Sequence, residues 1–175
     1  VLKLKDHNIF QQFYYKYLED KSLHKYIDGH HAGDATQKIA TQLGIEQSLV
    51  TTISTACSSA ANAILFGARL IKSGRLDRVV VGGADCLSKF TINGFKTLMI
   101  LSDTYNTPFD ENRKGLNLGE AAAYLVLESD TVVKAENKKV LAYVKGYGNA
   151  NDAFHQTASS ENGDGATLAM QKALR

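Results

Sequence analysis

The order strand, apolar helix, strand between residues 49 and 84 constrains the fold of this chain more than any other feature. Residues 49–55 form a β-branched run that predicts a strand. Residues 57–71 are small and apolar around a single charged residue, Arg69, which predicts a largely buried helix. Residues 78–84 are almost continuously apolar, as the strands of parallel sheets are. Together they predict a right-handed crossover unit and an α/β fold.

The remaining elements follow from periodicity and from turn residues. Aromatic residues at helical spacing predict a helix around residues 10–17, whose tyrosines we interpret as core or interface. Gly44 is the expected end of a helix over residues 33–43, and Gly74 ends the apolar helix. We further expect helices over residues 89–101, 131–136 and 166–175, strands over residues 121–128 and 139–146, and polar loops over residues 102–120 and 147–165.

Length and charge bound the class of protein. A chain of 175 residues with 44% hydrophobic and 22% charged residues suits one globular domain. A net charge of +2 without a basic block argues against nucleic-acid binding. No apolar run reaches the roughly 20 residues that cross a bilayer, so we expect no membrane segment. Two cysteines are too few for a disulfide scaffold, and we expect a reducing compartment, the cytoplasm.

Both ends of the sequence look like cuts. The chain begins with Val1 rather than Met, and it ends at Arg175 within a predicted helix. We therefore expect residues 1–175 to be a single partial domain of a longer protein, with a fold that is incomplete at both ends.

The sharpest local feature is Cys57, in the run Thr55-Ala56-Cys57-Ser58-Ser59. A cysteine between a strand and a helix lies on a tight turn at the helix N-terminus, where free N–H groups and the helix dipole favour an anion. Thiolate is the nucleophilic form of cysteine, and the Cys57 N–H would face a developing oxyanion. The alternative is a small buried cysteine that only fills space.

The other reactive residue types have plainer interpretations. Cys86 follows a strand without a comparable helix start, and we interpret it as structural. His30 and His31 lack partners at metal-ligand spacing, so no metal is expected. His155 lies in a long polar loop and is either a solvated side chain or a contributor to a site. No glycine pattern matches a nucleotide fingerprint.

Four motifs in order resemble the β-ketoacyl-acyl carrier protein synthases, condensing enzymes with the thiolase fold. They are Thr55-Ala56-Cys57-Ser58-Ser59; Gly82-Gly83-Ala84-Asp85; Pro108-Phe109-Asp110-x-x-Arg113 with Gly119-Glu120; and Asp152-Ala153-Phe154-His155-Gln156-Thr157 with Glu161-Asn162-Gly163-x-Gly165. They span roughly residues 30–175 and are closer to the elongating type than to the chain-initiating type.

The resemblance implies a layered thiolase-like fold, with helices packed on a mixed or parallel sheet. It implies that Cys57 takes an acyl group from a carrier thioester, and that a malonyl-carrier then loses carbon dioxide and condenses with it. Phe95 would line the acyl pocket, against the alternative of a plain core residue, and Thr157 would contact the pantetheine arm. The two catalytic histidines would follow Arg175, so residues 1–175 alone would not condense.

The resemblance also implies partners and leaves alternatives open. The acyl carrier protein, whose phosphopantetheine holds the substrates, and a second copy in a homodimer are the expected partners; no other cofactor is expected. Departures from the family pattern at residues 121–123 and 158–160 concern the carrier contacts and substrate class. The alternatives are a non-catalytic scaffold subunit, against which Cys57 argues, and a thioester hydrolase that would need His155 as its base.

Overall fold

The computed structural model describes residues 7–26, 29, 31–155 and 157–175, and it divides the chain into two compact units. The first unit covers residues 1–54 and the second residues 55–175. In the part of the chain that is described, no helix has the length and apolar character needed to cross a membrane.

The first unit consists of helices. They are α1 (His7–Glu19), the short 3-10 helix η1 (Lys21–Tyr26) and α2 (Asp34–Leu43). The predicted aromatic helix is confirmed as α1, but Tyr14 and Tyr15 are exposed rather than in a core. Gly44 ends α2 as predicted: its φ of 67° is the left-handed conformation that glycine adopts freely, and its N–H reaches the carbonyls of Ala40 and Thr41.

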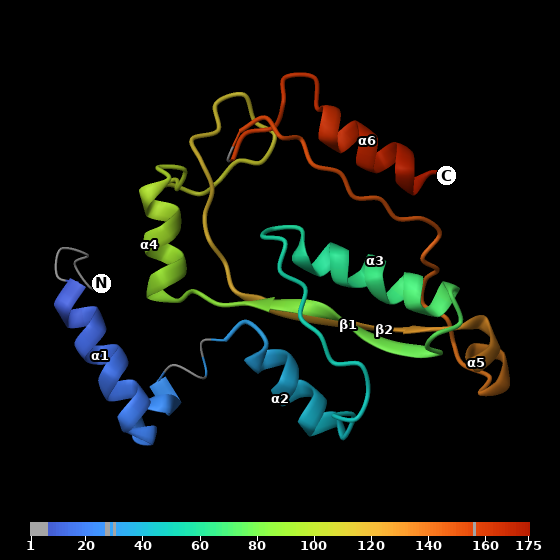
Figure 1. Cartoon of the computed structure of the whole chain (residues 1–175). Coiled ribbons are helices and arrows are strands. Elements are labelled where there is room, and N and C mark those ends of the chain that lie inside the picture. Colours follow the sequence, from blue (N-terminus) through green and yellow to red (C-terminus); the bar gives the residue numbers. More distant parts are fainter. Residues whose placement is uncertain (1–6, 27–28, 30, 156) are drawn as a thin grey trace. The chain divides into compact units, whose positions relative to one another are not determined.

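The second unit is built on helix α3 (Ser59–Lys72) and the strands β1 (Arg78–Asp85) and β2 (Ala121–Glu128), which lie together in Figure 1. The strands pair antiparallel, with Val81 opposite Leu125. Helix α3 contacts both strands and approaches β1 closely at Gly67, where a Cβ atom would lie 2.6 Å from Val81 Cγ1. Leu70 and Val81 are the buried hydrophobic residues of this unit among those described.

Two predicted strands are wrong. Residues 49–54 and 139–146 have no regular structure, and the predicted parallel crossover is replaced by the antiparallel β1–β2 pair. A strand is defined by hydrogen bonds to a neighbouring strand. Among the described residues, β1 and β2 pair only with each other, so these two segments have no neighbour with which to form a ladder. The α/β class itself is confirmed.

The expected burial of α3 is also wrong in extent. Within this helix only Gly67 and Leu70 are buried, because one face alone meets the strands. The β2 strand has no buried residue, and Leu125 and Val126 are 52% and 60% exposed. In residues 55–175 the apolar core is therefore confined to the line along which α3 meets β1.

Charged side chains fasten one end of the strand pair. Arg78 on β1 lies 2.5 Å from Glu128 Oε1 on β2 and 2.9 Å from Glu136 Oε2, and Lys138 pairs with the same two carboxylates. The hydrogen bond from Lys138, followed by that from Arg78, holds the pKa of Glu128 below its ordinary value. Alternating charges thus join the strands to the chain that follows helix α5 (Asp130–Ala135).

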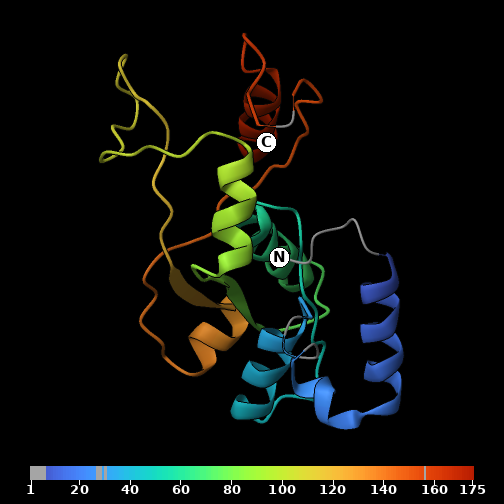
Figure 2. The same cartoon turned by 90° about the vertical axis from the view of Figure 1, so that its left-hand side faces the viewer.

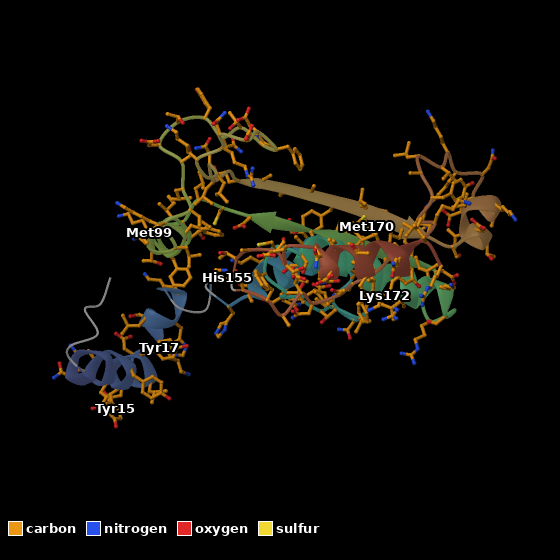
Figure 3. All side chains as sticks on the ribbon, turned by 90° about the horizontal axis from the view of Figure 1, so that it is seen from above. Tyr15, Tyr17, Met99, His155, Met170 and Lys172 are labelled. Carbon is orange, nitrogen blue, oxygen red and sulfur yellow. The ribbon has the colours of Figure 1, made fainter. Side chains whose placement is uncertain are left out.

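The remaining helices are α4 (Lys89–Thr97) and α6 (Asp164–Ala173). Both were predicted, although α4 ends earlier than expected. The loop at residues 102–120 projects away from the strands in Figures 1 and 2. Helix α6 lies against the extended segment 146–149, because glycines at positions 146 and 148 leave no Cβ atom to collide with the carbonyls of Ala173 and Ala169. Lys172, labelled in Figure 3, also donates to the Asn149 carbonyl at 3.0 Å.

Candidate functional site

Cys57 lies on the turn that leads into α3. The residue before it, Ala56, has a φ of 53°, a left-handed conformation that is strained for a residue with a Cβ atom. Ser58 is the N-cap and α3 begins at Ser59, so Cys57 immediately precedes the helix end. Its thiol is exposed and free. The predicted tight turn and accessible cysteine are confirmed, and the alternative of a buried, space-filling cysteine is wrong.

Hydroxyl groups hold this turn in place. The Ser58 hydroxyl donates to the Thr55 carbonyl at 2.8 Å and lies 3.0 Å from Thr55 Oγ1. The Ser59 hydroxyl donates to the Ala56 carbonyl at 2.6 Å, and its oxygen accepts the Thr55 N–H at 2.9 Å. These hydrogen bonds link residues on both sides of Ala56, and they stabilise its strained left-handed conformation.

The N-terminal end of α3 carries no side-chain cap among the described residues. Ser58 occupies the N-cap position, where a serine oxygen usually accepts an N–H from the first turn, but it makes no such bond. Its hydroxyl is used in the turn instead. The Ser59 N–H donates to the Ala56 carbonyl at 3.1 Å and the Asn62 N–H to the Ser58 carbonyl at 2.9 Å. Among the described residues, the N–H groups of Ala60 and Ala61 therefore stay available to an anion next to Cys57.

Two asparagines join the turn to a distant segment. Asn62 Nδ2 donates to Thr55 Oγ1 at 2.8 Å and to Ser58 Oγ at 3.2 Å, while Asn62 Oδ1 accepts from Asn149 Nδ2 at 2.8 Å. Sequence reasoning missed both asparagines. The position of Asn62 one turn after Ser58 on the same helix face was the available signal; nothing local indicated Asn149.

Cys86 is exposed as well, so it is not a buried core residue, and its structural role stays a prediction. Helix α4 begins at Lys89, the predicted position, so Cys86 lies three residues before a helix start. The N-terminus of α4 differs from that of α3, because the Ser88 side-chain oxygen accepts the Thr91 N–H at 3.0 Å and thereby caps α4. The two cysteines are therefore distinguished by capping rather than by burial.

Phe95 lies half-buried on α4. All residues of this helix are described, and none of them is fully buried. It is not the fully buried core residue of the alternative interpretation. An aromatic side chain on a helix with one partly covered face is available to line an apolar channel, and the predicted pocket role stays a prediction.

Thr157 is exposed, and its N–H donates to His155 Nδ1 at 3.2 Å. The Ala158 N–H donates to the same nitrogen at 3.2 Å. With Nδ1 accepting two hydrogen bonds, the neutral His155 ring carries its proton on Nε2. His155, labelled in Figure 3, thus organises its own loop, which matches the loop interpretation better than that of a catalytic base.

Asp152 fastens the loop of the fourth motif to α6. Its carboxylate accepts the Ser160 N–H at 2.6 Å, the Ser160 hydroxyl at 2.7 Å and the Gly165 N–H at 3.0 Å. The two bonds from Ser160, followed by the bond from Gly165, hold the pKa of Asp152 below its ordinary value. Gly165 permits this approach, since a Cβ atom there would lie 3.0 Å from the Asp152 backbone.

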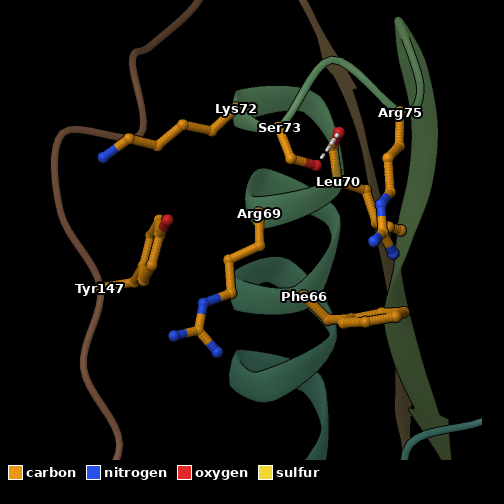
Figure 4. Close-up of a pocket in the computed structure, with 7 residues that line it drawn as sticks. All are labelled: Phe66, Arg69, Leu70, Lys72, Ser73, Arg75 and Tyr147. Carbon is orange, nitrogen blue, oxygen red and sulfur yellow. Dashed lines mark hydrogen bonds between the residues drawn. The ribbon is translucent and has the colours of Figure 1, made fainter.

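A surface pocket of about 450 Å³ lies at the other end of α3 (Figure 4). Phe66, Arg69, Leu70, Lys72, Ser73, Arg75 and Tyr147 line it, and the Arg69 guanidinium lies 5.9 Å from the centre of the Tyr147 ring. At about 1.5 Å of rise per residue, the C-terminal turns of α3 are far from Cys57. This pocket is not the acyl pocket that the sequence resemblance implies. Among the described residues, no group of acidic, His or Cys side chains has the arrangement of a metal site.

Comparisons with known proteins agree with the family that the first three motifs resemble. The family model described as "Beta-ketoacyl synthase, N-terminal domain" matches residues 12–132. The 3-oxoacyl-(acyl-carrier-protein) synthase 2 of Rhizobium meliloti is 40% identical over 129 residues, which are 69% of this chain and 31% of that protein. The corresponding synthase of Vibrio cholerae is 38% identical over 130 residues, 70% of this chain and 31% of that protein.

Solved structures are similar in fold. A ketosynthase in complex with its chain length factor, from Xenorhabdus doucetiae, superposes with a TM-score of 0.73 and 35% identity over 91% of this chain and 40% of the other. A ketosynthase in complex with a type II PKS acyl-carrier protein superposes with a TM-score of 0.77 and 26% identity, over 86% of this chain and 40% of the other. The chain thus spans about a third of the length of the curated relatives described above.

Proposed function

Because the chain belongs to the β-ketoacyl synthase family and matches its N-terminal domain, we propose that it supplies the nucleophile of a 3-oxoacyl-acyl carrier protein synthase. One observation carries the proposal: Cys57 is exposed on a left-handed turn directly before an uncapped helix N-terminus. This arrangement presents a sulfur to a substrate and positive partial charge to the anion that its attack creates.

In the first half-reaction the Cys57 thiolate attacks the carbonyl carbon of an acyl thioester on the carrier. A C–S bond forms, the carbonyl electron pair moves to oxygen, and the N–H groups next to the turn stabilise that oxyanion. The carbonyl re-forms as the carrier thiolate leaves and takes up a proton. The acyl group is then held on Cys57 as a thioester.

In the second half-reaction a malonyl-carrier loses carbon dioxide, and the electron pair of the broken C–C bond becomes a carbanion. The carbanion attacks the acyl-Cys57 carbonyl, and Cys57 leaves as a thiolate. The product is a 3-oxoacyl-carrier lengthened by two carbons. The decarboxylation step depends on the two histidines that the family resemblance places after Arg175, and their role stays a prediction.

The roles of the other predicted site residues belong to this proposal. Phe95 lines the acyl pocket, supported by its half-buried ring on α4. Thr157 contacts the pantetheine arm, supported by its exposure next to a loop that Asp152 and His155 keep ordered. The acyl carrier protein and a second copy of the chain are the proposed partners, with no cofactor beyond the carrier's phosphopantetheine. A cytoplasmic location is supported by the two free, exposed cysteines.

The test is acyl transfer from an acyl-carrier thioester to the full-length protein, which includes the predicted histidines after Arg175, read by mass spectrometry of cysteine peptides. We expect an adduct on Cys57 in the wild type and in the matched control Cys86→Ala, and none in Cys57→Ala. Addition of malonyl-carrier should then release the adduct together with carbon dioxide. Unchanged condensation by Cys57→Ala would refute the proposal.

The same assay separates the alternatives. A scaffold subunit would give no adduct on Cys57. A thioester hydrolase would give a short-lived adduct that decays without malonyl-carrier, and His155→Ala would prolong it. The bonds that His155 accepts within its own loop favour the synthase over the hydrolase.

A further inference from the structure

Asn62 is placed where it controls the helix end beside Cys57. Its side chain is half-buried on the first turns of α3, and the hydrogen bonds of its amide go to the turn and to Asn149. The Nδ2 group donates to Thr55 Oγ1 and Ser58 Oγ, while Oδ1 accepts from Asn149 Nδ2. Both ends of the amide are thus used, and its orientation is determined from two directions.

The consequence concerns the Ser58 hydroxyl. A serine at an N-cap ordinarily turns its oxygen toward the N–H groups of the first helical turn. Here that oxygen accepts from Asn62 and its proton goes toward Thr55, so the hydroxyl is held away from the helix end. Among the described residues, no side chain caps the N-terminus of α3 as a result.

We infer that Asn62 is a positioning residue for the reaction of Cys57: it engages the Ser58 hydroxyl and thereby keeps the N–H groups of Ala60 and Ala61, which a serine cap would occupy, free for the thiolate and the oxyanion. The inference rests on the proposed function for its biological purpose. Its physical content, the reactivity of the Cys57 thiol, is measurable without any carrier substrate.

The first experiment measures alkylation of Cys57 and Cys86 by iodoacetamide in the intact chain, with peptide-resolved mass spectrometry. In Asn62→Leu, Ser58 becomes free to cap α3 and competes with the thiolate for the N–H groups. We expect Cys57 to react about fivefold more slowly, the effect of an ordinary serine cap. The rate at Cys86 should not change. The matched control is Asn93→Leu, an exposed asparagine on α4, which should change neither rate.

A rescue experiment separates positioning from general loosening of the fold. If Asn62 acts through the Ser58 hydroxyl, the double variant Asn62→Leu/Ser58→Ala should react at the rate of Ser58→Ala alone, because no hydroxyl remains to cap the helix. If Asn62 instead only stabilised the fold, its replacement would lower the urea midpoint, and Cys57 in the double variant would react as slowly as in Asn62→Leu or more slowly.

Three results would overturn the inference: an unchanged Cys57 rate in Asn62→Leu, an equal change at Cys86, or a double variant without rescue. Failure of the proposed function looks different. In that case wild-type Cys57 takes no acyl group from the carrier, while the iodoacetamide rates still follow the pattern expected for Asn62 and Ser58.

Discussion

Replacement of Gly67 by alanine tests the packing of α3 against the strands. An added Cβ atom would lie 2.6 Å from Val81 Cγ1, 3.4 Å from Leu127 Cδ1 and 3.5 Å from Val79 Cγ1. The first of these distances is shorter than a carbon–carbon contact allows, and Val81 is only 6% exposed, so its methyl group has no open space to move into.

The magnitude follows from two opposing effects. Alanine in place of glycine inside a helix stabilises it by about 1 kcal/mol. Overpacking of a well-packed contact costs about 1–3 kcal/mol. Gly94 on α4 provides the matched control, since a Cβ atom there meets nothing within 4 Å and gains the helix effect alone. We expect Gly94→Ala to stabilise the chain and Gly67→Ala to be less stable than Gly94→Ala by about 1–3 kcal/mol.

Urea denaturation of the intact chain measures both variants. Val81→Ala alone removes two methyl groups and should cost about 1.6 kcal/mol in transfer free energy. Combined with Gly67→Ala it should cost less, because the added methyl group occupies the vacated space. If Gly67→Ala stabilised the chain as much as Gly94→Ala, the close approach of α3 to β1 would be refuted.

Three further predictions concern charge, thiol reactivity and the division of the reaction. The pKa of Asp152 is lowered by hydrogen bonds, so its stabilising contribution is complete above its ordinary pKa of 3.8 and is lost as the pH falls through the lower native pKa. The difference in urea midpoint between wild type and Asp152→Asn should therefore be constant at neutral pH and disappear in acid. A difference that persists below the native pKa would contradict this. Iodoacetamide should modify Cys57 faster than Cys86 at pH 7, because α3 is uncapped and α4 is capped by Ser88; equal rates would show that capping does not matter. A protein of residues 1–175 alone should acylate Cys57 weakly and release no carbon dioxide from malonyl-carrier, since members of a catalytic unit act together; robust release would show that the decarboxylating groups are within this segment.

Local sequence determined the helices and the reactive turn. Glycine at position 44 ends α2 because it adopts a left-handed conformation without cost, and glycine at position 74, with a φ of 69°, follows the last turn of α3 in the same way. The run from Thr55 to Ser59 places small and hydroxyl-bearing residues where a strained turn needs short-range hydrogen bonds. These features depend on neighbours within a few residues, so the order of residues predicts them.

Tertiary structure alone decided which distant segments meet. The runs at residues 49–55 and 139–146 have the composition of strands, yet only β1 and β2 pair among the described residues, and they pair antiparallel. Asn62 and Asn149 are 87 positions apart, and their bond depends on α6 lying against residues 146–149. Such contacts arise when separate elements bury surface together. The composition of one segment does not indicate which other segment will pack against it.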